Sequence, residues 1–281
     1  GRGALGDRSP GHSSRVIYAI LLVSMIIPLL KPLGLPLTTP AETQALYDLI
    51  ESIPSGTPIA ISMDCSAAGY DELAPGTIAV LTHAARKGLK VIGISVIDAG
   101  PSLLQKSIEA SELGQKEQGI DYVNLGFVAG GETAMASIAR DIKGMYPVDF
   151  TGKSTSNMPV LNGVNTLQDV ELLICVATGT PGVPEWIRQV GDPLKVPIAT
   201  VVIAGLVADY APYMQSKQLV GMVPGLRGAA GYEGLVGKLG RGTAGIDAQS
   251  VGHVVILALV VVGNIAYFAT KGRGKGKGGK A

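Results

Sequence analysis

Between residues 58 and 144 the sequence repeats one order of elements three times. Each unit has a short apolar run with the character of a β-strand, then small or acidic residues, and then an amphipathic helix that ends at a glycine. The apolar runs are 59–63, 90–97 and 121–128, and the glycines are Gly88, Gly119 and Gly144. Because this alternation is typical of right-handed βαβ units, we predict an α/β protein with a Rossmann-like, doubly wound, mostly parallel sheet.

The pattern continues less regularly toward the C-terminus. Apolar runs at 172–177, 197–204 and 219–223 predict three more strands. Residues 145–150 contain Pro147 and are expected to form an edge strand at best, because proline cannot donate a ladder hydrogen bond. Residues 151–165 are rich in Ser, Thr, Asn and Gly, which predicts an exposed excursion.

The residues that follow the strands are the candidates for ligand binding. In an open α/β sheet, ligands bind in the crevice outside the carboxyl ends of the strands. The candidate residues are Asp64, Cys65, Ser66, Asp98, Gly130, Gly131, Glu132, Thr133, Thr178 and Thr180. The turn at 130–131 opens a helix, so its backbone N–H groups could hold a phosphate.

Catalytic signatures are weak in this sequence. Cys65 lies on a strand-to-helix turn, but His83 lies in the middle of a helix and the other two histidines lie outside the domain, so a buried structural thiol is favoured. Asp64, Asp98 and Glu132 could share a hard cation such as Mg²⁺, although carboxylates at strand ends also serve as helix caps. No G-x-S-x-G or Walker motif occurs, nor a G-x-G-x-x-G after a strand. We therefore predict no catalytic residue, no bound metal and no cofactor.

Two apolar segments near the ends predict membrane helices. Residues 16–30 and 251–270 carry no charge, and they contribute to the high hydrophobic fraction of 47% and the positive mean hydropathy of the chain. We expect uncleaved transmembrane helices over 16–37 and 249–270, because no cleavage signature follows the first segment. Partners would then include the lipid bilayer.

Charge predicts the orientation of the chain. Residues 37–248 carry 14 basic and 21 acidic residues, a net charge of −7, whereas residues 1–36 carry +3 and residues 249–281 carry +5. Positive flanks are typical of the cytoplasmic side, so the tails 1–15 and 271–281 are expected in the cytoplasm and the α/β domain, 38–224, outside it. An acidic domain also argues against nucleic-acid binding.

Glycine recurs at every third position through most of the segment 225–248. Glycines at this spacing do not line up along one face of an α-helix, and each interior glycine costs a helix roughly 1 kcal/mol in stability relative to alanine. We therefore expect an extended or 3₁₀-like path, which serves either as a connector into the second membrane helix or as a small-residue edge against a neighbouring subunit.

Together these features favour a structural role. The first hypothesis is a two-pass, membrane-anchored, extracytoplasmic domain that is a scaffold subunit of a homo-oligomeric membrane assembly, with other membrane proteins as further partners. The alternative is a small-ligand-binding or sensory module that uses the crevice, and a third is a metal-assisted hydrolase. Fold alone does not decide among them.

Overall fold

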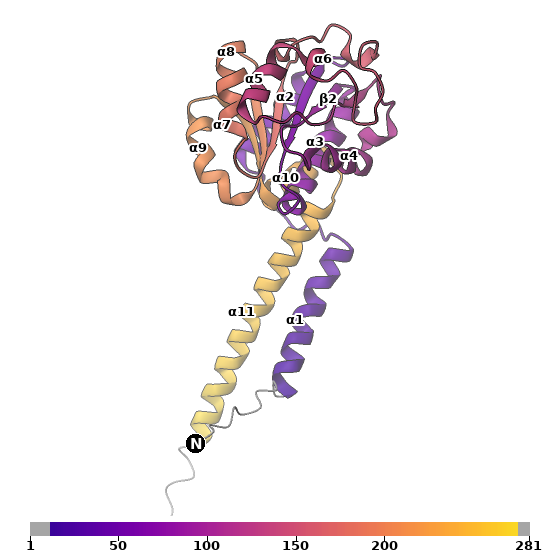
Figure 1. Cartoon of the computed structure of the whole chain (residues 1–281). Coiled ribbons are helices and arrows are strands. Elements are labelled where there is room, and N and C mark those ends of the chain that lie inside the picture. Colours follow the sequence, from indigo (N-terminus) through magenta and orange to yellow (C-terminus); the bar gives the residue numbers. More distant parts are fainter. Residues whose placement is uncertain (1–11, 275–281) are drawn as a thin grey trace, which may run out of the picture. The chain divides into compact units, whose positions relative to one another are not determined.

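The computed structural model describes residues 12–274 (Figure 1). The chain forms two compact units, one of residues 36–243 and one that combines residues 1–35 with residues 244–281. Most of the expected N-terminal tail and of the basic C-terminal tail lies outside the described residues.

The first of these units is built on a six-stranded sheet in the order β3-β2-β1-β4-β5-β6, and every neighbouring pair is parallel. The strands are β1 (Pro58–Asp64), β2 (Lys90–Ile94), β3 (Tyr122–Asn124), β4 (Leu173–Ala177), β5 (Ile198–Val202) and β6 (Leu219–Pro224). The predicted Rossmann-like α/β fold with a parallel sheet is therefore confirmed.

Helices and short helical turns connect the strands. The α-helices of this unit are α2 (Ala41–Ser52), α3 (Tyr70–Lys87), α4 (Gly100–Ala110), α5 (Glu132–Arg140), α6 (Ile142–Met145), α7 (Val183–Trp186), α8 (Asp192–Leu194), α9 (Val207–Gln215) and α10 (Gly225–Val236). The shorter turns are η1 (Glu112–Gln115), η2 (Pro159–Leu161), η3 (Leu167–Asp169) and η5 (Ala204–Leu206), together with the π-helical turn η4 (Ile187–Gly191).

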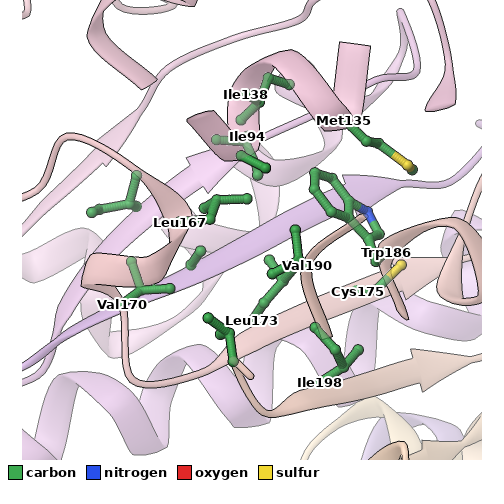
Figure 2. Close-up of a cluster of buried hydrophobic side chains, with 14 of the residues drawn as sticks. Ile94, Met135, Ile138, Leu167, Val170, Leu173, Cys175, Trp186, Val190 and Ile198 are labelled. Atoms are coloured by element: carbon green, nitrogen blue, oxygen red, sulfur yellow. The ribbon is translucent and has the colours of Figure 1, made fainter. Parts of the chain in front are cut away.

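Hydrophobic side chains cover both faces of the sheet. Along β4, Leu173 and Cys175 point into one core while Ile174 and Val176 point into the other, as the twofold alternation of a strand requires. The first core takes side chains from α5, α7 and η4 and includes Trp186 (Figure 2). The second takes side chains from α2, α3, α4 and α10. Burial on both faces explains why the strands are continuously apolar in the sequence.

Two expectations concern the middle of the chain. Residues 145–150, expected to form an edge strand at best, form no strand and make a single bridge, between Val148 and Ser154. Residues 151–165 are mostly exposed, as expected, but Met158, Val160 and Leu161 are buried in the first core. The apolar residues scattered through this polar segment pack against the sheet, a long-range contact that local composition does not reveal.

Two of the three helix-ending glycines also behave differently from the prediction. Gly88 does end α3, in the left-handed conformation with φ of 67°. However, α4 ends at Ala110 and is followed by η1, so Gly119 lies beyond it, and Gly144 lies inside the short helix α6. Ser111 separates α4 from η1, because its hydroxyl accepts the Leu113 N–H and its own N–H bonds the Ile108 carbonyl.

The glycine-rich segment is helical, contrary to expectation. It forms α10 and then enters α11 (Arg241–Gly274). A methyl group on Gly228 would clash with Pro224, and one on Gly231 would lie 3.1 Å from Thr39 Cγ2. Small residues let α10 approach its neighbours closely, and this packing offsets the low helix propensity of glycine.

The second unit contains α1 (His12–Leu30) and most of α11. Among the described residues, one helix is long and apolar enough to cross a membrane, over Arg241–Ile265, and the apolar stretch of α1, Arg15–Leu30, is shorter. The helix of α1 ends at Leu30 instead of continuing to residue 37, and Pro32 and Pro36 fall within the extended segment that follows. The expected second membrane span is thus not established.

Within this unit, one contact joins α11 to the segment that follows α1, and a second joins α11 to α1 itself. The Asp247 carboxylate accepts the backbone N–H groups of Leu33, Gly34 and Leu35 at 2.7, 2.9 and 3.1 Å. Gly252 faces Met25: a Cβ atom added to Gly252 would lie 3.5 Å from Met25 Sδ. Figure 1 shows the two helices side by side. Small residues at such a crossing let two apolar helices pack closely.

Candidate functional site

The strand order places a topological switch point between β1 and β4. The chain builds the sheet outward from β1 through β2 to β3, and then returns to start again at β4 on the other side. The loops 65–69 and 178–182 follow these two central strands and meet above the sheet. The Ser66 N–H donates to Thr178 Oγ1 at 3.1 Å, and a methyl group on Gly69 would clash with Thr178. Of the predicted residues, Ser66 and Thr178 are therefore brought together, at the position where such sheets bind ligands.

Asp64 lies beneath these loops and is 2% exposed. Its Oδ2 accepts the Ser62 hydroxyl at 2.6 Å and the Trp186 indole N–H at 2.7 Å, and its Oδ1 accepts the Val96 N–H at 3.0 Å. Burial raises the pKa of this carboxyl, and the hydrogen bonds from Ser62, Trp186 and Val96 oppose that shift. Asp64 thus joins β1 to the segment after β2 and to α7, and it is not open to solvent.

The two cysteines are buried and free, as their apolar surroundings indicated. Burial, followed by the nearby Asp64 charge, raises the pKa of the Cys65 thiol to about 12. The pKa of Cys175 is also raised well above its usual value by burial. A thiol nucleophile needs the thiolate form, which burial disfavours at both positions. Neither cysteine is placed for nucleophilic chemistry.

Glu132 does not face the crevice as a free carboxylate. Arg188 donates to both of its oxygens at 2.9 Å, and Gln189 donates to Oε1 at 2.9 Å. These hydrogen bonds, Arg188 first, lower the pKa of Glu132 to about 2. The adjacent glycines, Gly130 and Gly131, both have positive φ, at 128° and 55°. The 130–131 turn and Glu132 therefore fix the start of α5 against η4.

The remaining candidates are exposed and dispersed. Asp98 is exposed, and its Oδ1 accepts the N–H of the next residue, Ala99, at 2.8 Å, so this hydrogen bond is local. Thr133 and Thr180 are also exposed, on α5 and on the loop after β4 respectively.

The sequence left open, as a less favoured alternative, that Asp64, Asp98 and Glu132 share one cation. Within residues 12–274, no group of three or more His, Cys, Asp or Glu side chains is placed to hold a metal ion. Asp64 is enclosed by its donors, Glu132 is paired with Arg188, and Asp98 accepts the N–H of Ala99. The structure therefore does not bring these three carboxylates together.

The sequence analysis missed the residues of α7 and η4 that organise this edge. Trp186 supplies the indole donor to Asp64, and Arg188 bridges Glu132 and Glu185 at 2.9 Å each. Glu185 is buried and accepts the Gly182 N–H at 2.8 Å, which holds the loop after β4. The one available signal was the sole tryptophan of the chain, directly after the loop of a central strand.

A second polar cluster lies away from the strand ends, between α2, α3 and α10. The buried His83 ring makes 2.8 Å hydrogen bonds to Tyr232 Oη through Nδ1 and to Glu51 Oε1 through Nε2. Tyr47 stacks on the same ring, with 4.5 Å between centroids. Burial lowers the pKa of His83 and raises that of Tyr232 well above its usual value. This cluster ties α10 to the two helices beside it.

These features define a Rossmann-like α/β domain whose edge above β1 and β4 is tightly hydrogen bonded. Comparisons of the chain with models of protein families, with curated proteins and with solved structures found no match.

Proposed function

We propose that the chain is a structural subunit anchored in a membrane, whose α/β domain assembles with further copies of the same chain. In this proposal both apolar helices enter the bilayer, the domain lies outside the cytoplasm, and the termini lie inside. The charge distribution supports this orientation, since the positive charge is concentrated in residues 1–36 and 249–281.

The apolar helices support the anchoring. At about 1.5 Å per residue, Arg241–Ile265 reaches about 37 Å, more than the roughly 30 Å hydrocarbon core of a bilayer. Its large side chains are exposed, as lipid contact requires; examples are Val254, Leu257 and Val262. Arg15–Leu30 reaches only about 24 Å, so a second crossing depends on local thinning of the bilayer or on snorkelling of flanking cations.

One observation carries the proposal of self-assembly. The sheet-containing unit, which the structure describes in full, exposes five large hydrophobic side chains, and four of them surround β3. Ile120 precedes this edge strand and Phe127 follows it. Val148 and Phe150 lie on a neighbouring segment, in which the Phe150 N–H donates at 2.9 Å to the carbonyl of Asn124, the last residue of β3. Apolar side chains gathered at a sheet edge favour a protein interface.

The acidic and thiol groups at the carboxyl ends of the strands support a structural role over a catalytic one. Each acidic group that follows a strand already accepts hydrogen bonds from this chain, and both thiols are buried. A catalytic group, by contrast, has to contact the substrate, and it has to be free to donate a proton, to accept one or to bind a metal ion.

The experiment is a pair of variants of the full chain, extracted in mild detergent and sized by light scattering. Phe127→Ser/Phe150→Ser removes apolar surface beside β3, so the assembly should dissociate. Leu239→Ser changes the fifth exposed hydrophobic side chain, away from β3, and should keep the wild-type mass. An unchanged mass in the double variant would contradict this role for the β3 edge.

A second candidate function is binding of a small ligand, favoured by the switch point itself. Ser66, Ala67 and Ala68 are exposed on the loop after β1, where small side chains let a ligand approach the backbone. Native mass spectrometry of the gently extracted protein tests this alternative, because a bound small molecule lost in Ser66→Trp would favour the ligand-binding module.

A further inference from the structure

An apolar cavity of about 220 Å³ lies between α3 and α10. Ile78 and Ala79 of α3, Ala110 at the end of α4 and Val236 of α10 line it, and the segment 238–241 forms part of its wall. This volume is below the roughly 300 Å³ at which sites for whole small ligands begin. The cavity is therefore suited to part of an apolar chain.

Cations flank this cavity. Lys238 Nζ lies 3.3 Å from Glu112 Oε1, but Glu112 is already bound by Arg86 through both oxygens, at 2.8 and 2.6 Å. Arg241 lies 3.8 Å from Asp71, and both of those side chains are mostly exposed. Three cations thus share two carboxylates, the half-buried Glu112 and the exposed Asp71, which leaves Lys238 and Arg241 able to pair with an added anion.

The cavity wall contains one more carboxylate, which points toward the backbone at the start of α11. Glu233 is 4% exposed and accepts the N–H groups of Gly240, Gly242 and Thr243 at 2.9, 2.9 and 2.8 Å. The backbone N–H groups at the start of α11 therefore stabilise this carboxylate in its buried position.

Chain connectivity places this rim near the membrane surface. The candidate membrane span of α11 begins at Arg241, although its uncharged part begins only after Asp247. Lys238 precedes Arg241 by three residues, so it lies within about 11 Å of the start of the candidate span at 3.8 Å per residue. The polar headgroup layer on each side of a bilayer is about 5–7 Å thick. Lys238 and Arg241 therefore fall close to the level of lipid phosphates.

We propose that this cavity binds part of one acyl chain of an anionic phospholipid, whose phosphate pairs with Lys238 and Arg241. The cavity supplies the apolar contact, and the two cations supply the charge complementarity. This inference rests on the membrane anchoring in the proposed function and does not depend on self-assembly.

The test uses the full chain in mild detergent, with phosphatidylglycerol or phosphatidylcholine added and bound lipid counted by native mass spectrometry. Wild type should retain phosphatidylglycerol in preference to phosphatidylcholine. Ala110→Leu fills the cavity from its exposed edge and should abolish retention. Lys238→Gln/Arg241→Gln should weaken retention by about fivefold for each charge removed.

Two controls match these variants. Ala208→Leu enlarges an exposed alanine of α9 outside the cavity, and Lys106→Gln/Lys116→Gln removes two exposed charges elsewhere; both should retain lipid as wild type does. Equal retention in Ala110→Leu, or equal retention of the two lipids, would overturn the site. Carbonate extraction reports anchoring separately: a chain that stays in the membrane pellet yet retains no phosphatidylglycerol overturns the lipid site and leaves the anchoring intact.

Discussion

The indole N–H of Trp186 donates a 2.7 Å hydrogen bond to Oδ2 of Asp64, and both residues are buried. The only tryptophan of the chain thereby connects the end of the first strand to α7, across the switch point of the sheet. A buried carboxylate stabilises a fold only when donors surround it, so this pair is central to the stability of the crevice.

Trp186→Phe should destabilise the domain by about 2–4 kcal/mol, because it leaves the buried carboxylate short of a donor and opens a small cavity. A thiol-reactive dye can follow thermal unfolding in detergent, since both native cysteines are buried in the folded state. Tyr146→Phe is the control, because it removes only a weak 3.4 Å bond to the Ser95 carbonyl and should cost less. Equal melting temperatures for Trp186→Phe and wild type would refute the role of the pair.

The His83 cluster predicts a loss of stability in acid. Burial lowers the pKa of folded His83 below 6.5, so the folded chain binds a proton less readily than the unfolded chain. The resulting stabilisation is fully present above pH 6.5 and is lost as the pH falls from that value through the lower pKa of folded His83. The titratable groups that face the ring are Glu51 and Tyr47 from α2, Arg86 and Lys87 from α3, and Tyr232 from α10.

Thermal unfolding between pH 7.5 and 5.5 checks this prediction. The melting temperature of wild type should fall across the range, and His83→Gln should flatten the dependence because it removes the titrating ring. His253→Gln, which changes an exposed histidine of α11, should keep the wild-type slope. A slope that persists unchanged in His83→Gln would show that another group is responsible.

Two glycines should respond to alanine in opposite directions. A Cβ on Gly221 would lie 2.7 Å from Leu46 Cβ and 2.9 Å from its backbone, so α2 would have to move away from β6 at a cost of about 1–3 kcal/mol. A Cβ on Gly234 meets nothing within 4 Å, and this exposed position in α10 should gain about 0.5–1 kcal/mol from the better helix former. The two melting temperatures, measured side by side, test the packing of β6; a tolerated Gly221→Ala would contradict it.

The proposed orientation can be tested with a single new thiol. Ser156 is exposed on the domain, whereas the two native cysteines are buried. Ser156→Cys in intact cells should react with a membrane-impermeant maleimide, and wild type should not. Labelling only after the cells are lysed would place the domain in the cytoplasm and reverse the predicted topology.

The sheet could be predicted because its signals are local. Strands such as β4 and β5 are buried on both faces and are therefore continuously apolar in the sequence. The parallel arrangement followed from the alternation with helices. The short segment 145–150 could be predicted only as an edge strand at best, and it forms none, since a weak apolar run around Pro147 does not show whether a partner strand is available.

The candidate site was predicted less well because its contacts join distant segments. The position of Asp64 at a strand end was visible, but its partner Trp186 lies 122 residues away. Glu132 looked like a free carboxylate because Arg188 lies 56 residues further on. Likewise, the period of glycines argued against a helix, whereas the missing side chain of Gly231 lets α10 approach Thr39, which is distant in the sequence.

The central claim is that the chain is a self-assembling, membrane-anchored subunit. The most direct measurement is the mass of the wild-type particle, extracted in mild detergent and determined by light scattering with the detergent contribution subtracted. The account predicts one defined species whose protein mass is a multiple of 28.8 kDa, at least twice that value. A particle with the mass of a single chain at all concentrations would contradict it.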